Sequence, residues 1–461
     1  MCIGTGSLGE RGGTLHNHSG NFPGFADLGL KHLANEGTLP DAPVRLPQSA
    51  IEIMHTTQLD YLREWQRLAY EAGMVGCDYP VAEGGGGRTD CQIVANQEMQ
   101  RAGRPFLPNI LGLGMAAPTI HIHGTQTVRE TLLPRLFSCA DIWCQGFSEP
   151  GAGSDLASLQ TRAVKDGDEW VVNGQKVWTS GAQVADRGML VARTNIDTPK
   201  HRGITYFIID MDQPGIEIRP LKQMNGASQF NEVFFTDARV SDANIIGDRD
   251  AGWGVAVTTL AFERSGIGGG GSLMGAGGMP GEKARLLDLR VGDILEGKGP
   301  KAEGSSSMAF FGRSAKLTRQ LAQSMGKTDD PVVRQGLAQL HSLEEIARYT
   351  TLRAKAAIQA GGRPGPETST GKLAAANLMR AARDLGMSII GAHGMLNGSD
   401  APLGGAMQML TLSSPSIAIA GGSDQIQRNI IGERVLGLPR EPSVDKDVAF
   451  RDLKVGTQRA G

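Results

Sequence analysis

Features that would assign the chain to a membrane, a nucleic acid or the cell exterior are missing from its sequence. No apolar run approaches the roughly 18 residues of a membrane-spanning helix. The net charge of −2 provides no basic excess for binding nucleic acid or an acidic membrane. Residues 1–20 lack the apolar segment of a secretory signal. The five cysteines are odd in number and scattered, which favours reduced thiols, so we expect a cytoplasmic protein without membrane insertion.

Common signatures of nucleotide and metal sites are also absent. There is no GxxxxGK[ST] phosphate loop, and GAGSDL at 151–156 does not follow a strand in a βαβ unit, which argues against a Rossmann site. His121 and His123 have no nearby acidic or cysteine partner, which favours surface or packing roles. Cys139 and Cys144 lack both zinc spacing and a second pair. We therefore expect no metal.

Hydrophobic periodicity divides the chain into helices, then strands, then helices. Helical spacing predicts a first group of helices at 51–72, 90–102, 112–122 and 126–136. Short β-rich runs, separated by turn residues, follow at 170–172, 175–178, 188–193, 203–211, 215–219 and 231–236. The helical pattern returns at 253–265, 308–326, 331–360, 368–393 and 423–436. Ser423 and Asp424 can cap the last of these helices.

This order predicts three domains in a chain of 461 residues, which is long enough for them. We expect a loose N-terminal arm at 1–47 and a helical domain at 48–140. A central β domain follows at 141–250, and a C-terminal helical bundle occupies 251–461. The glycine-rich segment at 266–307 is predicted to be a flexible insertion in this bundle.

The loop Phe147–Asp155 reads FSEPGAGSD and is dense in small residues and hydroxyls. Glycine has no Cβ, so such a loop lets the backbone come close to a flat or anionic ligand. Downstream, Asn173-Gly174 separates two β-rich runs and fits the turn of a type I′ hairpin. The hairpin would present Trp178 together with two hydroxyl residues, which suits a planar heteroaromatic cofactor.

These residues carry a resemblance to a known family. SEPGAGSD followed by NGQKVWTSGA is similar to the flavin-binding signature of the acyl-CoA dehydrogenases, and GGSDQIQRNIIGERVLGLPREP from Gly421 to Pro442 is a second match. The resemblance extends over nearly the whole chain beyond its first few tens of residues. It implies a mostly α, α+β fold with an N-terminal helical domain, a central β-barrel or β-sandwich domain and a C-terminal four-helix bundle.

The resemblance also implies the reaction. The cofactor would be FAD and the substrate an acyl-CoA thioester, with an electron-transfer flavoprotein as acceptor and a homodimer or homotetramer as the assembly. A carboxylate would remove the α-proton while the β-hydride passes to flavin N5. Because a thioester α-proton is weakly acidic, the base needs a raised pKa in a dry site. The thioester oxygen must receive hydrogen bonds as negative charge develops on it.

The position of the base departs from the commoner family pattern. Many members carry a glutamate just before the start of the last bundle helix, where this chain has Gly421. A minority use a Glu-Arg pair on the helix after the β domain, which Glu263 and Arg264 match. We predict that Glu263 is the base and that the Gly421 backbone N–H donates to the thioester oxygen. The alternative is a structural ion pair between Glu263 and Arg264, which would lower the pKa of Glu263.

The resemblance assigns further contacts. Cofactor contacts are expected at Phe147, Ser148, Gly153, Trp178, Thr179, Ser180 and Gln425, and substrate contacts at Ser154, Arg264 and Ala420. The competing interpretation is packing at the edge of the β domain and, for Gln425, helix capping. Ala420 stands where many relatives hold an aromatic residue, which predicts a roomier pocket for branched, cyclic or otherwise bulky acyl groups.

Two other functions stay open at this point. The missing glutamate at position 421 also fits a catalytically silent subunit that binds flavin or acyl-CoA and pairs with an active homologue. A flavin oxidase or monooxygenase of the same fold is the second alternative. The Arg-Phe-Gly motif with which many relatives grip the flavin across a subunit interface is absent, although Arg334 could replace its arginine.

Overall fold

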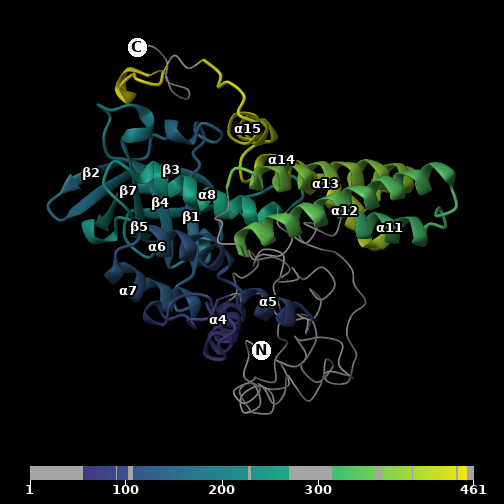
Figure 1. Ribbon diagram of the computed structural model, residues 1–461, viewed down its shortest axis with the longest axis horizontal. Helices are drawn as coiled ribbons and strands as arrows, with labels where there is room; N and C mark the ends of the chain where they lie inside the picture. The colour runs from purple at the N-terminus through teal and green to yellow at the C-terminus, as the bar shows by residue number, and fades with distance from the viewer. Residues whose placement is uncertain are drawn as a thin grey trace.

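A computed structural model describes residues 56–89, 91–101, 107–226, 230–268, 314–359, 365–396, 398–442 and 445–453. The predicted arm at 1–47 and the predicted insertion, apart from the end of helix α8, lie outside these residues. Figure 1 shows a β sheet at one side, a group of helices beneath it and a long helical bundle that projects to the other side. The predicted fold class is confirmed.

The N-terminal helices pack into one core with the edge of the sheet. They are α4 (Thr56–Glu71), α5 (Cys91–Arg101), α6 (Ala117–His123) and α7 (Gln126–Phe137), with a π-helical turn, η2 (Gly112–Ala116), before α6. The first helix stops before Gly73, whose φ of 70° is a conformation that glycine adopts readily. Trp65, Phe137 and Trp143 belong to the shared core of helices and sheet, so the two parts form one packed body.

The central sheet has seven strands in the order β1-β4-β2-β3-β7-β6, with β5 also paired to β4. The strands are β1 (Trp143–Gly146), β2 (Arg162–Asp166), β3 (Glu169–Ser180), β4 (Arg187–Arg193), β5 (Ile204–Asp210), β6 (Ile216–Leu221) and β7 (Phe230–Ser241). Most neighbours are antiparallel, while β1 runs parallel to β4. Trp170 and Phe207 meet edge to face inside this layer, with ring centroids 5.6 Å apart.

The predicted Asn-Gly hairpin is wrong. Asn173 and Gly174 lie inside the continuous strand β3, where the register with β7 shifts between Val172 and Gly174. The turn lies earlier, between β2 and β3, at Gly167 with a φ of 60°. Gly174 is required for another reason, because a Cβ there would lie 2.5 Å from Thr161 Oγ1. A long strand with an irregularity therefore replaces the two short strands that the sequence predicts.

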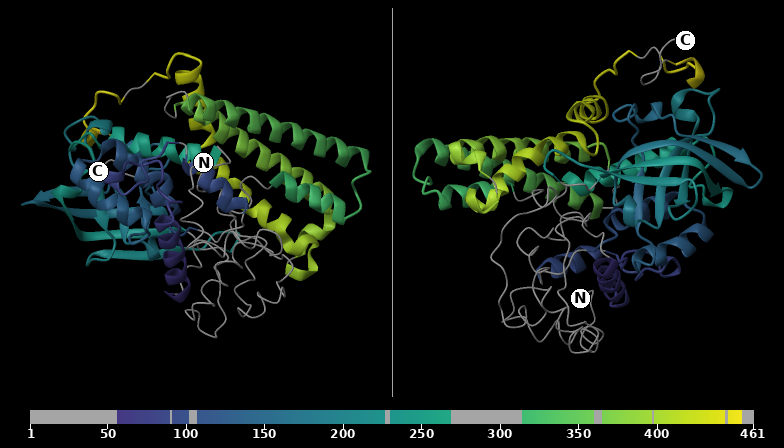
Figure 2. Two further views of the ribbon diagram at one scale, coloured as in Figure 1. Left: turned by 60° about the horizontal axis from the view of Figure 1, so that its bottom comes forward. Right: turned by 180° about the vertical axis from the view of Figure 1, so that it is seen from behind.

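The remaining helices form the bundle that extends away from the sheet in both views of Figure 2. They are α8 (Gly252–Gly268), α11 (Ser314–Ser324), α12 (Pro331–Gln359), α13 (Thr368–Ile390), α14 (Ala406–Ile419) and α15 (Asp424–Ile430). Helix α13 is central and packs against α8, α11, α12 and α14. Helix α14 was not predicted, since Pro415 and its neighbouring serines are typical of a loop. Ser423 caps α15 as predicted and accepts a hydrogen bond from Ile426 N.

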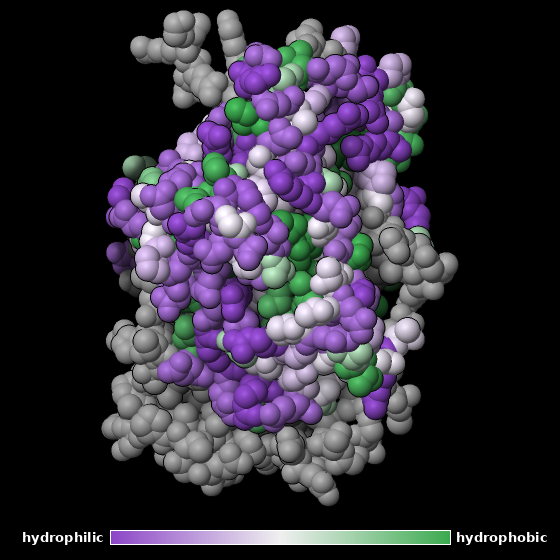
Figure 3. Space-filling model, turned by 90° about the vertical axis from the view of Figure 1, so that its left-hand side faces the viewer, coloured by the Kyte–Doolittle hydropathy of each residue, from purple (hydrophilic) through white to green (hydrophobic). Residues whose placement is uncertain are grey.

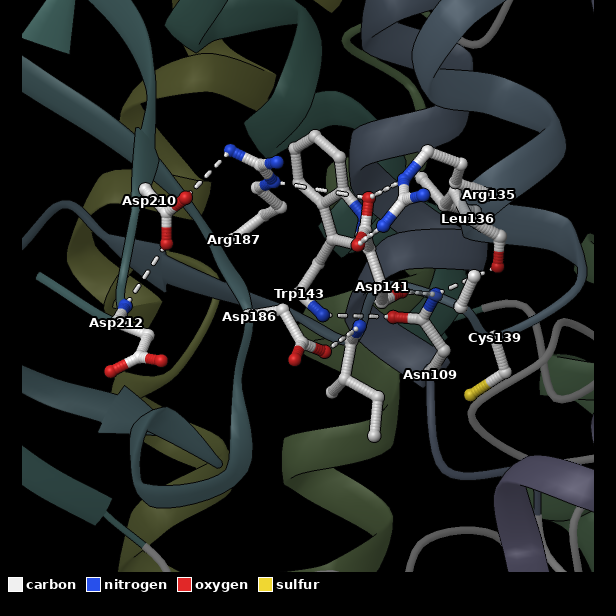
Figure 4. A network of polar contacts seen from close by, with 12 residues as sticks. Asn109, Arg135, Leu136, Cys139, Asp141, Trp143, Asp186, Arg187, Asp210 and Asp212 are labelled. Atoms are coloured by element: carbon white, nitrogen blue, oxygen red, sulfur yellow. Dashed lines mark hydrogen bonds and ion pairs between the residues drawn. The ribbon is translucent and has the colours of Figure 1, made fainter. Parts of the chain in front are cut away.

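A network of polar contacts joins the N-terminal helices to the sheet (Figure 4). The Asn109 side chain donates to the carbonyl oxygens of Leu136 and Asp141, both at 2.9 Å, and accepts from Trp143 N at 3.0 Å. Arg135 pairs with the Asp141 carboxylate at 2.6 Å. Asn109 is buried, so each contact satisfies a backbone group that water cannot reach. The start of β1 is thereby fixed against the end of α7.

The last described segment, residues 445–453, returns from the bundle to the sheet. Phe450 N donates to Thr198 O at 2.9 Å, and the Phe450 ring lies 3.7 Å from the guanidinium of buried Arg193. Lys200 pairs with Asp445 at 2.7 Å and with Asp155 at 3.0 Å. The tail therefore reaches the end of the loop that carries the SEPGAGSD motif.

The surface in Figure 3 is largely hydrophilic, with hydrophobic residues gathered near its centre. Within the described part of the chain, no helix has the length and apolarity needed to cross a bilayer. Cys77, Cys139 and Cys144 are buried free thiols, and burial raises the pKa of each.

Candidate active site

Helix α8 is held against the sheet by a buried hydroxyl network. Thr259 Oγ1 lies 2.9 Å from Thr119 Oγ1 on α6 and 3.2 Å from the Tyr206 hydroxyl on β5. All three side chains are fully buried. Gly252 allows the helix to begin close to β5, because a Cβ there would lie 2.4 Å from Tyr206 N. The network fixes α8 one helical turn before Glu263, on the same face.

Glu263 lies where α8, the sheet and the turn before α15 meet. Its carboxylate accepts a hydrogen bond from Gln145 Nε2 of β1 at 3.4 Å, and the Gly421 backbone is near enough to lower its pKa. Surrounding protein removes water from the carboxyl, and this desolvation raises its pKa, although Gln145, Arg264, Gly421 and Lys372 act in the opposite direction. The structure therefore brings Glu263 and the turn at Gly421 together.

Arg264 does not neutralise its neighbour. Among the described residues, the hydrogen-bond donor to the Glu263 carboxyl is Gln145, while Arg264 acts on it as a nearby charge. Desolvation lowers the pKa of Arg264, Arg434 adds repulsion, and its Nε is buried with no hydrogen-bond partner in the described part of the chain. The geometry thus favours a protonatable Glu263 over a tight ion pair.

The turn at residues 420–424 owes its shape to two glycines and one glutamine. Gly421 and Gly422 have φ values of 65° and 93°, which side chains disfavour. Gln427 Nε2 donates to both of their carbonyl oxygens, at 2.8 and 3.1 Å. Ala420 is partly buried beside this turn. Gln425 is exposed whereas Gln427 is buried, so Gln427 is a residue that the sequence reading missed.

The loop at 147–155 rests on a buried ion pair that the sequence reading also missed. Lys176 Nζ donates to Glu149 Oε1 at 2.8 Å and to Phe147 O at 2.9 Å. Glu149 also accepts from Gln160 N at 2.6 Å and Thr161 N at 2.9 Å. Despite its burial, these partners hold the pKa of Glu149 below its ordinary value. The ion pair between Lys176 and Glu149 therefore fixes the loop to strand β3.

The predicted contact residues on this loop differ in exposure. Phe147 is buried, with its ring edge to face against Tyr206 at 5.8 Å and its carbonyl oxygen bonded to Lys176, so its side chain is not open to a ligand. Ser148 is partly buried, and Gly153 and Ser154 are exposed. Ser154 Oγ lies 3.5 Å from Ser423 Oγ, which brings the loop to the start of α15. The two sequence signatures therefore meet in space.

The end of β3 combines an exposed ring with a buried hydroxyl. Trp178 is 57% exposed and has a φ of 62°, which is unusual for a bulky residue. Its ring stands edge to face on Phe230, with centroids 5.7 Å apart. Thr179 is buried, and its hydroxyl has no hydrogen-bond partner in the described part of the chain. Partly buried Ser180 pairs with Phe230 across the strands.

These features fit a planar, polar cofactor. Trp178 offers an open aromatic surface, and no heavy atom lies near the position of a Cβ at Gly153. Thr179 Oγ1, Arg264 Nε and Gln427 Oε1 are buried polar atoms without hydrogen-bond partners among the described residues. Buried polar groups are normally satisfied, so such atoms are expected where a ligand supplies the missing partner.

Comparison with known proteins agrees with this geometry. The models of the acyl-CoA dehydrogenase N-terminal, middle and C-terminal domains match residues 45–140, 144–238 and 304–436. Acyl-CoA dehydrogenase IpdE1 of Mycobacterium tuberculosis is 36% identical over 388 residues, which cover 82% of this chain and 88% of the relative.

The chain belongs to the acyl-CoA dehydrogenase family. It is a flavoprotein oxidoreductase whose reaction is acyl-CoA dehydrogenation, as the sequence predicts. Two solved acyl-CoA dehydrogenases share its fold. The steroid ACAD Tcur3481–Tcur3483 has a TM-score of 0.67 at 25% identity, covering 96% of this chain and all of that one. The ChsE4–ChsE5 complex of Mycobacterium tuberculosis has a TM-score of 0.63 at 28% identity, covering 85% and 95%.

The two histidines considered as metal ligands have other roles in this dehydrogenase. His121 Nδ1 lies 2.6 Å from the carboxylate of buried Glu83, and His123 Nε2 lies 2.8 Å from Thr258 Oγ1. In the described ranges, no group of three or more His, Cys, Asp or Glu residues is placed to bind a metal. Packing between helices accounts for both side chains.

Proposed function

We propose that Glu263 is the base that removes the substrate α-proton. Desolvation raises the pKa of its carboxyl, as a base for a weakly acidic proton requires. Its position beside Gly421 supports this role, because Gly421 is where the more frequent family glutamate would stand. The Glu263 carboxylate lies in the region of Gly421 but comes from helix α8. This proximity is the observation that carries the proposal, and it argues against a silent subunit.

The Gly421 N–H has a second role in this proposal. It lies near the Glu263 carboxyl and would donate to the thioester oxygen when substrate enters, where it would stabilise developing negative charge. Gln427 supports this role, because its two hydrogen bonds keep the turn in a conformation that exposes the N–H. A preorganised donor costs no rearrangement as the charge develops.

The flavin is proposed to be FAD, which accepts the substrate hydride when it is bound. Trp178, Thr179 and Ser180 would contact its ring system from one strand end, with Ser148 and the Phe147 backbone completing the contact. Gly153 would allow close approach of the loop. Gln425, on the first turn of α15, would reach the adenylate end, where the helix N-terminus offers free N–H groups.

The acyl group is proposed to be branched, cyclic or otherwise bulky. The steroid acyl-CoA dehydrogenase among the structural neighbours supports a large substrate. Ala420 supports it from within the chain, since a small side chain beside Gly421 leaves room near the reacting carbons. Ser154 and Arg264 would line the path of the CoA chain. The partner in reoxidation is proposed to be an electron-transfer flavoprotein, and the assembly a homodimer or homotetramer.

Anaerobic titration with a panel of acyl-CoA thioesters tests this function. The yellow holoenzyme should bleach with bulky acyl groups, and E263Q should retain its flavin but lose bleaching. Undiminished bleaching of E263Q would refute the base assignment. Bleaching only by short straight-chain thioesters would refute the bulky-substrate proposal. Rapid H2O2 formation in air would instead indicate an oxidase.

A further inference from the structure

A polar side chain lies on the face of the sheet that packs against the N-terminal helices and α8. Successive side chains of a strand point to opposite faces, so Gln145 of β1 shares a face with Trp143. Trp143 belongs to the apolar core of helices and sheet, together with Met189 of β4 and Ile208 of β5. An amide among apolar neighbours is costly unless it is hydrogen-bonded, so Gln145 needs a partner on this side of the sheet.

That partner is the carboxyl of Glu263. Gln145 Nε2 donates to Glu263 Oε2 at 3.4 Å, and other contacts fix each end of this hydrogen bond. On one side, β1 pairs in parallel with β4, with Gln145 opposite Met189. On the other side, the hydroxyl network around Thr259 holds α8 against the sheet. A contact between two elements that are each held in place is suited to accurate positioning.

We propose that Gln145 is a positioning residue that orients the Glu263 carboxyl for removal of the substrate α-proton. The amide occupies Oε2 and leaves the other oxygen, Oε1, for the substrate. When the α C–H bond breaks, the proton joins Oε1 and the electron pair of that bond stays with the substrate. Oε2 can accept from the amide before and after this transfer, because it keeps lone pairs in both forms of the carboxyl. The inference rests on the proposed role of Glu263 as the base.

A neutral donor suits this task better than a charged one. An amide holds the carboxylate without neutralising it, whereas a tight ion pair would remove much of its basicity. Desolvation raises the pKa of Glu263, and among the groups that oppose this effect the Gln145 amide lowers the pKa most, ahead of the charges of Arg264 and Lys372. Removal of the amide should therefore change both the rate of proton removal and its pH dependence.

The experiment follows the proton step alone. An acyl-CoA thioester with sulfur in place of its β-carbon has no β-hydride to transfer, so exchange of its α-protons with deuterated water reports the action of the base. The anaerobic holoenzyme is incubated with this thioester, and NMR measures the exchange rate across pH. Q145M removes the amide and keeps the length of the side chain. It should slow exchange about tenfold or more, as expected for one hydrogen bond to a charged group.

Two further measurements distinguish positioning from packing. Q145M should move the midpoint of the pH profile to higher pH, because the carboxylate loses a donor, and should leave the dissociation constant of the thioester unchanged. The matched control is Q175M, since Gln175 Nε2 donates to Glu232 Oε1 at 2.8 Å on the same sheet. This variant should leave the exchange rate and the midpoint unchanged. If Q145M does not retain its flavin, Q145L takes its place with the same expected result.

The outcomes separate this inference from the proposed function. Wild-type exchange with an unmoved midpoint in Q145M overturns the inference even if the melting temperature falls, since the amide would then only pack β1 against α8. Loss of exchange in E263Q together with wild-type exchange in Q145M leaves the proposed base standing and removes Gln145 from it. Undiminished exchange in E263Q refutes the base and, with it, the inference.

Discussion

The backbone of Gly421 is close enough to the Glu263 carboxyl to lower its pKa, so the helix after the sheet meets the turn before the last bundle helix at these two residues. The two residues share one site only because α8 and α13 pack together and the turn ends beside them. The proposed base and the proposed donor to the thioester oxygen both depend on this proximity.

The pH dependence of stability should differ between the wild type and E263Q. Desolvation raises the pKa of Glu263 in the folded protein, so the folded state binds this proton more tightly than the unfolded state does. Its contribution is then fully present below the unfolded glutamate pKa and is lost as pH rises through the folded pKa. The melting temperature of E263Q minus that of the wild type should therefore increase with pH across this window. A constant difference would contradict the raised pKa.

Alanine at position 421 should reduce catalysis more than stability. The φ of 65° at Gly421 makes a Cβ unfavourable by about 1–2 kcal/mol, and the added methyl would lie in the buried space beside Glu263. We expect G421A to slow flavin reduction at least about tenfold, the change that corresponds to about 1.4 kcal/mol. Stopped-flow reduction and thermal melting measure the two effects.

The matched control for that substitution is G437A. Gly437 also has a positive φ, of 70°, but has open space where a Cβ would stand. It should show similar backbone strain with unchanged flavin reduction. Equal loss of activity in both variants would mean that strain alone, and not the site, explains the effect of G421A.

Replacing one member of the Lys176–Glu149 ion pair should destabilise the protein more, relative to its parts, than replacing both members together. Lys176 and Glu149 are both buried, so E149Q or K176M leaves one charge without its partner, at a cost of about 3–5 kcal/mol. The double variant E149Q/K176M should cost less than the sum of the two. Urea unfolding gives the free energies, and absorbance gives the flavin content. R348Q, which removes an exposed ion pair with Glu345, should leave both unchanged.

Substitution of Trp178 should separate cofactor binding from folding. Its φ of 62° is strained for tryptophan but tolerated by asparagine. We therefore expect W178N to keep or raise the melting temperature of the apoprotein while it lowers the retained flavin. W178F keeps a ring over the site and should retain more flavin than W178N. Loss of flavin in neither variant would remove Trp178 from the proposed cofactor site.

The parts of the fold that sequence predicts well are those that depend on local patterns. Helical spacing located α4, α7, α8 and α12, and the hydroxyl of Ser423 identified the start of α15. Helix α14 was not predicted because Pro415 lies inside it. Packing against α13 there outweighs the local preference of proline and serine for loops. The domain boundaries stay predictions.

The site was predicted less completely, for a physical reason. Signature residues named Glu263 and Gly421, but the buried lysines Lys176 and Lys372 gave no local signal, because a buried charge is recognised only once its distant partner is known. Asn173-Gly174 misled the prediction, since the same dipeptide fits a turn and an irregular strand. The exposed ring of Trp178 and its positive backbone φ likewise depend on a register shift between β3 and β7.

The last described segment, residues 445–453, brings the chain back to the sheet. From the sheet the path passes through α8, crosses the bundle, leaves by α15 and comes back to Arg193 and Lys200, where Phe450 and Asp445 fasten it. Sheet and bundle are therefore linked twice along the chain, once through α8 and once through residues 445–453, and an ion pair and a ring contact make the second link.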